Sequence, residues 1–189
     1  TTSLILQDAR VPAENVLGEI GNGARIAFNI LNVGRFKLAA AVVGGGIVAM
    51  QEAMEYAKTR QQFGRPIAEF GMIQHKVAEA VSRLYAARSA VDRTAGYIDQ
   101  NIATSDPADP DRDSKGIDSA IREYMVECSI LKVFCSEVLD YAVDEIVQIH
   151  GGDGYTQEYD AERHARDSRI NRIFEGTTEI NRIVVGGEV

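Results

Sequence analysis

A long apolar stripe runs between residues 121 and 149. Apolar side chains recur there every three or four positions, a spacing that places them on one face of an α-helix. Gly151 and Gly152 follow directly, and glycine commonly ends helices. Because a helix with one apolar face needs partners to cover it, this segment predicts a packed helical domain. The stripe consists of Ile121, Met125, Cys128, Leu131, Cys135, Val138, Ala142, Ile146 and Ile149.

Two earlier segments show the same periodicity. One runs from about residue 24 to residue 56, interrupted only by the triple glycine at 44–46, which predicts either close helix contact or a break. The other predicts an amphipathic helix through Ile73, Val77, Val81, Leu84, Val91 and Ile98. Short helices are expected over 161–170 and 178–186, and residues 101–116, rich in Asp and Pro, are expected to form an exposed connection.

Residues 1–23 lack this periodicity and contain turn residues, so we expect a strand end and a loop there. The predicted fold is therefore all-α, an up-and-down four-helix bundle over residues 24–189. Residues 1–23 are predicted to be the end of a preceding β domain and a linker. The chain is accordingly expected to be a piece of a larger protein.

Composition narrows the class of protein. The 189 residues are 45% hydrophobic and 25% charged, close to the average of globular domains, and the net charge of −8 argues against a nucleic-acid partner. No uninterrupted apolar run approaches the roughly 20 residues of a membrane span, and no secretory leader is recognisable. Cys128 and Cys135 would lie about 10 Å apart on one helix, which predicts reduced thiols and an intracellular protein.

Several common kinds of site are disfavoured. None of His75, His150 and His164 has a glutamate three residues earlier, so the Glu-x-x-His pairs of di-iron bundles are missing and we expect no metal. Both cysteines lie on the apolar stripe and are expected in the core rather than as nucleophiles. The glycine-rich "GGDGY" follows a helix, whereas a dinucleotide fingerprint follows a strand.

The stretch "RIFEGTTEI" places Glu175 between Phe174 and Gly176. One interpretation is an acidic residue in the first turn of the last helix, where the helix dipole favours it. The other is a catalytic base, because a carboxylate between an apolar surface and open backbone becomes more basic when water is expelled. The residues of this stretch leave both interpretations open.

The stretch "RQQFGRPI" also permits two interpretations. Arg60, Gln62 and Phe63 supply a phosphate donor, an amide and a stacking ring within four residues, which suits a nucleotide-bearing cofactor. The alternative is an ordinary connection between helices with a turn at Pro66.

Six collinear segments together resemble the carboxy-terminal half of the acyl-CoA dehydrogenases, from about residue 8 to residue 186. They are "DARVPAENVLG", "ILNVGR", "RQQFGRPIAEFGMIQHKVAE", "QIHGGDGY", "ARDSRI" and "RIFEGTTEINR". Two motifs, "ILNVGRF" and "IFEGT", are most similar to the very-long-chain branch. The resemblance implies FAD-dependent α,β-dehydrogenation of a fatty acyl-CoA thioester, with electrons passing to an electron-transfer flavoprotein.

The resemblance also implies roles for residues around the predicted base. Glu175 matches the glutamate that removes the α-proton while the β-hydrogen leaves as hydride. Some members carry this base at the position before the arginine of "NVGR", which is Gly34 here, so Glu175 is the remaining candidate. Arg35 and Asn32 match residues on the CoA side of the substrate, and Phe174 and Gly176 are expected to contribute to substrate binding.

Further segments match cofactor contacts of the family. Arg60, Gln62 and Phe63 are expected to reach the FAD of the partner subunit. A second contact across the subunit interface is expected at Gln148, Gly151 and Gly152. Thr177 and Glu179 match FAD contacts within the subunit, although Glu179 stands where some relatives carry glutamine.

The resemblance implies a homodimer or homotetramer in the bacterial cytoplasm or the mitochondrial matrix. Two alternatives belong to other classes of function. An acyl-CoA oxidase would pass the electrons to oxygen, and an isolated helical bundle would oligomerise without turning over substrate.

Overall fold

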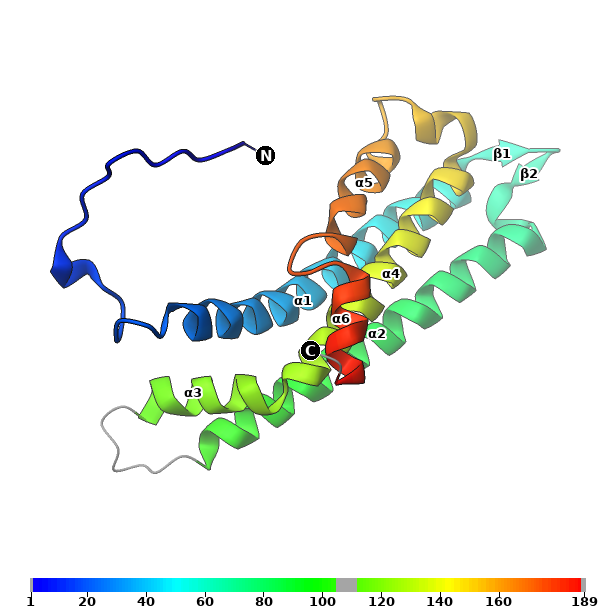
Figure 1. The fold of residues 1–189 in the computed structure, drawn as a ribbon. Coiled ribbons are helices and arrows are strands. Elements are labelled where there is room, and N and C mark those ends of the chain that lie inside the picture. Colours follow the sequence, from blue (N-terminus) through cyan, green and yellow to red (C-terminus); the bar gives the residue numbers. More distant parts are fainter. Residues whose placement is uncertain (1, 105–111, 188–189) are drawn as a thin grey trace.

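Three long helices form the body of the protein in the computed structural model, which describes residues 2–104 and 112–187 (Figure 1). They are α1 (Gly23–Thr59), α2 (Gly71–Ala103) and α4 (Met125–His150). Figure 1 shows α1 running toward one end of the molecule, α2 returning and α4 running out again. This up-and-down arrangement confirms the predicted all-α bundle.

Small residues allow the three helices to approach closely. The core contains Ala39, Ala53 and Ala57 of α1, each at most 2% exposed, against Ala80 and Ala87 of α2 and Ala142 of α4. A Cβ at Gly46 would lie 2.8 Å from a methyl carbon of Leu84, so this glycine marks a close contact between α1 and α2. The helix continues through Gly44 and Gly45, which face open space, so the triple glycine makes no break.

The stripe between residues 121 and 149 spans two helices and not one. Helix α3 (Arg112–Glu123) ends before Tyr124, whose backbone leaves the helical region, and α4 begins at Met125. The two helices use different partners, because Ile121 and Ala120 pack against Ile98 of α2 while α4 packs chiefly against α1. The apolar spacing continues from α3 into α4, so the sequence pattern does not reveal the change of direction at Tyr124. Residues 105–111, within the predicted connection, lie outside the described residues.

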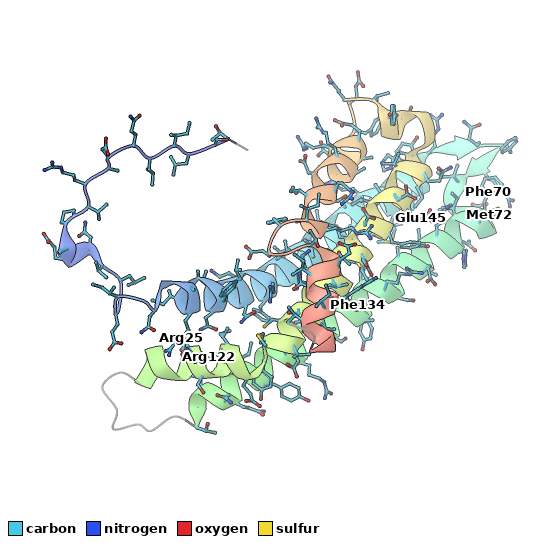
Figure 2. All side chains as sticks on the ribbon, viewed as in Figure 1. Arg25, Phe70, Met72, Arg122, Phe134 and Glu145 are labelled. Carbon is cyan, nitrogen blue, oxygen red and sulfur yellow. The ribbon has the colours of Figure 1, made fainter. Side chains whose placement is uncertain are left out.

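A small hairpin joins α1 to α2. Strands β1 (Gln61–Gln62) and β2 (Arg65–Pro66) pair antiparallel, with Gln61 opposite Pro66, and a 3₁₀ helix, η2 (Ile67–Glu69), follows. Phe63 and Gly64 both adopt positive φ, as the tight turns of two-residue hairpins require. Figure 2 labels Phe70 and Met72 at the beginning of α2, beside this hairpin.

The C-terminal part returns along α4. Residues 151–155 form the 3₁₀ helix η3 (Gly151–Tyr155), and α5 (Ala161–Ser168) continues into a 3₁₀ helix, η4 (Arg169–Arg172). Helix α6 (Thr178–Gly186) then packs on α4. These elements confirm the two short helices expected over 161–170 and 178–186.

Residues 2–22 contain one 3₁₀ turn, η1 (Ala13–Asn15), and no strand. Their apolar side chains are exposed, among them Leu4, Ile5 and Ile20. A strand needs a neighbour for its backbone hydrogen bonds, and within the described residues none lies beside this segment. Its assignment to a β domain stays a prediction.

By length and composition helix α1 is apolar enough to cross a membrane, a test that the core helix of a soluble protein also passes. The uninterrupted-run criterion missed it because glycines, alanines and a few polar residues dilute the apolar ones. Only 44% of its most apolar window is buried in the protein, yet the buried side packs on α2 and α4 as a core helix does. The same helix buries Asn32 and Arg35.

Candidate functional site

Glu175 lies in a strained turn between η4 and α6. Its φ is +59°, a left-handed conformation that costs a non-glycine residue about 1–2 kcal/mol, and Gly176 follows with φ of +84°. Helix α6 begins only at Thr178, capped by the Thr177 hydroxyl, which accepts from the N–H of Ile180. The acidic residue of the first helical turn is Glu179, so the helix-dipole interpretation of Glu175 was wrong.

Two buried side chains hold this turn by its carbonyl oxygens. The Asn181 amide donates to the carbonyls of Gly176 at 2.8 Å and Thr177 at 3.0 Å, and more weakly to Glu175 at 3.4 Å. Arg35 Nε donates to the Glu175 carbonyl at 3.1 Å. Because Asn181 is fully buried and Arg35 only 7% exposed, both contacts are shielded from water.

Arg35 links the turn to two further helical positions. Its Nη1 donates to Asn32 Oδ1 at 2.9 Å, one turn earlier on α1, and to Ser129 Oγ at 3.2 Å on α4. Burial lowers the pKa of Arg35, and the neighbouring Cys128 and Glu175 partly offset that effect. The structure therefore brings Asn32, Arg35 and Glu175 together.

The side chain of Glu175 points at α1, where Gly34 leaves space for it. A Cβ at Gly34 would lie 2.5 Å from Glu175 Oε2 and 2.7 Å from Oε1. Oε2 is buried and has no hydrogen-bond partner among the described residues. The carboxylate is thus confined between a helix backbone and a rigid turn, with one oxygen free to accept a proton.

Phe174 lies beside this carboxylate and is 41% exposed. It borders a cavity of about 400 Å³ that is lined mainly by apolar residues of α1 and α4, including Leu38, Val42 and Leu139. A Cβ at Gly176 would lie 3.1 Å from Asn181 Nδ2, a tight contact, and the φ of +84° at this position also favours glycine. Phe174 thus borders an apolar cavity, whereas Gly176 packs against the side chain that holds the turn.

The two predicted cross-subunit segments meet at the far end of the bundle, away from α6 (Figure 1). Tyr56 connects them, because its hydroxyl donates to Asp153 at 2.7 Å and its ring stacks on His150 at 4.2 Å. Arg60 lies 3.7 Å from the Asp153 carboxylate. Burial and the Asp153 carboxylate raise the pKa of Tyr56 to about 12. This end of the bundle brings together Arg60, Gln62, Phe63, Gln148, Gly151 and Gly152.

These side chains are available to a ligand. Phe63 is 92% exposed at the hairpin tip, and Gln62, Gln148, Gly151 and Gly152 are exposed as well. The adjoining cavity of about 630 Å³ is rich in carboxylates, with Glu52, Glu55, Asp153, Glu158 and Asp160 in its lining. Thr177 and Glu179 lie elsewhere, at the start of α6 beside Glu175.

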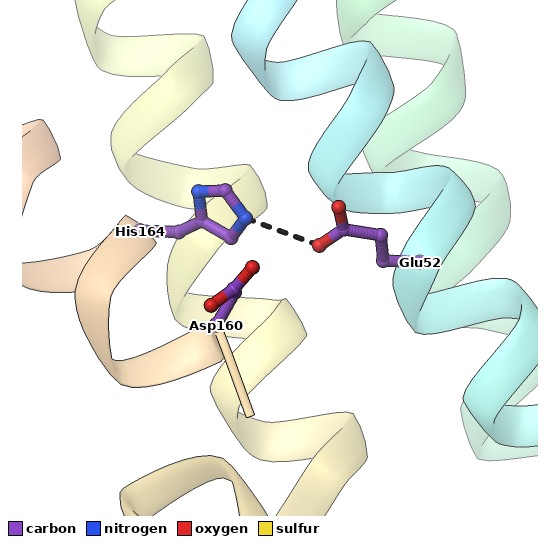
Figure 3. A group of neighbouring side chains, drawn as sticks. All are labelled: Glu52, Asp160 and His164. Atoms are coloured by element: carbon purple, nitrogen blue, oxygen red, sulfur yellow. Dashed lines mark hydrogen bonds and ion pairs between the residues drawn. The ribbon is translucent and has the colours of Figure 1, made fainter. Parts of the chain in front are cut away.

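A second group of ligand-type side chains was missed by the sequence analysis. Glu52 of α1, Asp160 immediately before α5 and His164 within α5 offer ligand atoms that all lie within 4.8 Å of one another (Figure 3). His164 Nε2 is 3.1 Å from Glu52 Oε2, and Asp160 also pairs with Arg163 at 2.7 Å. Glu52 and His164 are 112 positions apart in the sequence, so no local sequence motif identifies the group. In the protein it joins α5 to α1.

Three residues of the Glu175 site were also missed: Ser129, Lys132 and Asn181. Ser129 and Lys132 are fully buried on α4, and Asn181 on α6. In the sequence they appear as ordinary polar residues bordering an apolar stripe. Only their tertiary contacts distinguish them from polar residues on a solvated helix face.

The comparisons with known proteins agree with this geometry. The family model of the acyl-CoA dehydrogenase C-terminal domain matches residues 21–189. A probable acyl-CoA dehydrogenase of Bacillus subtilis is 54% identical over 185 residues, 98% of this chain and 31% of the relative. The human mitochondrial very long-chain specific acyl-CoA dehydrogenase is 39% identical over 187 residues, 98% of this chain and 25% of the relative.

A solved structure supports the same assignment. The crystal structure of an acyl-CoA dehydrogenase complexed with FAD from Bacillus anthracis matches with a TM-score of 0.93 and 54% identity. That match covers 97% of this chain and 32% of the other chain, so this chain spans about a third or less of the relatives named here. The chain belongs to the acyl-CoA dehydrogenase family, and it corresponds to the C-terminal helical domain of that family.

Proposed function

We propose that this chain is the C-terminal part of a FAD-dependent dehydrogenase that converts fatty acyl-CoA thioesters to trans-2-enoyl-CoA. The observation that carries the proposal is the placement of Glu175. Its carboxylate fits against Gly34 with one unpartnered oxygen, on a turn held by Arg35 and Asn181. A base must be positioned before it can accelerate proton removal, and positioned bases contribute about 10²–10⁴ in rate.

In this proposal Glu175 accepts the α-proton of the thioester on its carboxylate. Its backbone N–H is the group proposed to polarise the thioester carbonyl, which makes the α-proton more acidic. Because the turn is held in place, the carboxylate and the backbone N–H of Glu175 keep the same relative position. Phe174 and Gly176 frame the reacting carbons, and Arg35 with Asn32 supports the turn from the CoA side.

FAD, when bound, supplies the acceptor for the β-hydrogen. The residues at the end of the bundle suit the nucleotide part of this cofactor, because Arg60 offers a half-exposed guanidinium and Phe63 an exposed ring. Gly151 and Gly152 would allow close approach of a ligand to the backbone. We assign these residues, with Gln62 and Gln148, to the FAD of a partner subunit and Thr177 to that of the same subunit.

Glu179 is poorly suited to bind a phosphate group of the cofactor. Hydrogen bonds from its own backbone N–H and from Thr177 lower the pKa of this exposed carboxyl group. An ionised carboxylate repels a phosphate, so in this proposal Glu179 accepts hydrogen bonds from hydroxyl or amino groups of the cofactor.

The partners follow from the same assignment. We propose an acyl-CoA substrate, an electron-transfer flavoprotein as electron acceptor, and a homodimer or homotetramer in which each bundle contributes to a neighbour's FAD site. Bacterial cytoplasm or mitochondrial matrix would be the compartment. Reoxidation of the reduced enzyme by oxygen compared with electron-transfer flavoprotein separates this proposal from an acyl-CoA oxidase.

The decisive experiment replaces Glu175 by Gln in the full-length protein. The substitution keeps the size of the side chain and removes the basic oxygen. Flavin bleaching by acyl-CoA should fall at least 100-fold while FAD content and the unfolding temperature stay unchanged. Glu79→Gln, which breaks a surface pair with Arg83 on α2, is the control and should bleach normally. A Glu175→Gln rate above one tenth of the parental rate would show that Glu175 is not the base.

A further inference from the structure

Among the residues that the structure describes, Lys132 is the largest fully buried side chain, and its side-chain nitrogen has no hydrogen-bond partner. Burying an ammonium group costs several kcal/mol unless opposite charge compensates it. Lys58 and Lys76, by contrast, each pair with a carboxylate. Lys132 therefore either gives up its proton or is compensated by charges that lie near it without touching it.

The position of Lys132 directs it toward the Glu175 turn. It lies three residues after Ser129 on α4, so the two side chains share one face of the helix. Ser129 accepts from Arg35, and Arg35 donates to the Glu175 carbonyl, so this face of α4 is two hydrogen bonds from the turn. Helix α4 also packs against both η4 and α6, which flank the turn on either side.

The unpartnered buried atoms of this region have complementary chemistry. Lys132 Nζ is a donor, while Glu175 Oε2 and Asn181 Oδ1 are acceptors, and all three are buried in the site around α4, the turn and α6. The charged or ionisable groups that act on Lys132 or Arg35 come from four elements: Arg35 of α1, Cys128 of α4, Arg172 of η4 and the exposed Glu179 of α6. Arg172 is itself paired with Glu137 and Asp140 of α4. Two of these four groups are cations, so Glu175 and Glu179 are the carboxylates that balance Lys132.

We propose that Lys132 is a positioning residue whose buried ammonium acts as the counter-charge of Glu175 and keeps that carboxylate directed at Gly34. The effect of Lys132 on the reaction rests on the proposed function. The electrostatic interaction between Lys132 and Glu175 does not, and it can be measured without catalysis. Burial and Arg35 lower the pKa of Lys132, whereas Glu179 and Glu175 raise it. Because the coupling between two charges is reciprocal, removing the charge of Glu175 must change the pH at which Lys132 titrates.

The first test measures Lys132 itself, without substrate or cofactor. In the 189-residue chain labelled with ¹⁵N-lysine, the Lys132 Nζ resonance should titrate above neutral pH but below the other lysines. Glu175→Gln should move that titration about one pH unit lower, because it removes a charge that favours the ammonium. Glu79→Gln, which breaks a surface pair with Arg83, is the control and should leave it unchanged. An unmoved titration in Glu175→Gln, or titration below pH 7 in the parent chain, overturns the inference.

The second test measures the reaction in the full-length protein. Lys132→Met removes the charge at similar length, so the pH profile of flavin bleaching should move about one unit higher and the rate at pH 7 should fall about tenfold. Lys132→Arg retains a cation and should restore most of the rate. Lys76→Met, which removes a lysine between α2 and α4, is the matched control. A uniform loss of rate at every pH in Lys132→Met would indicate a packing role only and would overturn the inference.

The two failures can be told apart. If the full-length parent does not bleach with acyl-CoA, the proposed function fails, while the Nζ titration still decides whether Lys132 and Glu175 are coupled. If the parent bleaches and Lys132→Met has an unchanged pH profile, only the role of Lys132 is wrong.

Discussion

Gly34 and Glu175 face each other so closely that no side chain fits between them. A Cβ at Gly34 would lie 2.5 Å from Oε2 and 2.6 Å from the carboxyl carbon of Glu175. Gly34 of α1 has no side chain at the point where the carboxylate of Glu175 packs against the helix. The position of the predicted base depends on this pair.

Gly34→Ala is therefore expected to displace the carboxylate without unfolding α1. Flavin bleaching in the full-length protein should fall roughly 100-fold, because a shift of about 1 Å in a catalytic group can cost that much. Gly44→Ala is the control on the same helix, where a Cβ meets nothing within 4 Å. It should leave bleaching unchanged and raise the free energy of unfolding by about 1 kcal/mol. Equal bleaching in both variants would contradict the steric role of Gly34.

Asn181→Ala should destabilise the Glu175 turn. The substitution leaves the buried carbonyls of Gly176 and Thr177 without the amide that donates to them, and each lost partner costs about 1–3 kcal/mol. We expect a loss of about 3 kcal/mol in urea unfolding of the 189-residue chain. Asn22→Ala, which removes an exposed bond to Glu19, should change stability by less than about 0.5 kcal/mol. Similar losses in the two variants would mean that Asn181 does not hold the turn.

Alkaline pH should destabilise the bundle through its buried thiols. Burial raises the pKa of Cys128 to about 11 and that of Cys135 to about 12, from 9.0 in both cases. The unfolded state therefore loses these protons first, so stability that is complete below pH 9 is lost as pH rises toward 12. Urea midpoints measured from pH 8 to pH 11 should fall, and less steeply in Cys135→Ala. A parallel fall in that variant would assign the effect to other groups.

Arg60→Ala should weaken FAD retention by the full-length protein. The guanidinium lies at the end of α1, nearly half exposed, and pairs only loosely with Asp153. We expect at least a tenfold higher FAD dissociation constant and a lower unfolding temperature, since a ligand of the native assembly stabilises it by mass action. Arg88→Ala, which breaks an exposed pair with Asp92, is the control. An unchanged dissociation constant would contradict the placement of Arg60.

The 189-residue chain is expected to fold as a helical bundle and to self-associate. Apolar side chains remain exposed between α1 and α2, where Met54 and Val81 line two adjoining cavities. Val81→Glu should lower the sedimentation coefficient by favouring the monomer, because it places a charge on this apolar surface. Ser82→Glu adds the same charge at the neighbouring exposed position and should not. A monomeric parent chain would contradict the prediction.

Local periodicity was enough to predict most of the helices. The spacing of Ile73, Val77 and Leu84 located α2, and the boundaries of α6 agree with the prediction for 178–186, because helical amphipathicity is encoded in neighbouring residues. The break at Tyr124 was missed for the same reason. An apolar stripe shows that a face is buried but does not show which partner buries it, and α3 and α4 use different partners.

The candidate site divides in the same way. Glu175 and the motif containing Gly34 and Arg35 could be identified in the sequence, since their residue types and order resemble a known family. The roles of Lys132, Ser129 and Asn181 could not, because burial and hydrogen bonding depend on what the fold places opposite them. Arg35 and Glu175 are 140 residues apart, yet a single hydrogen bond joins them. Sequence periodicity reports the faces of individual helices, whereas the electrostatics of a buried carboxylate depend on distances that exist only after those helices have packed.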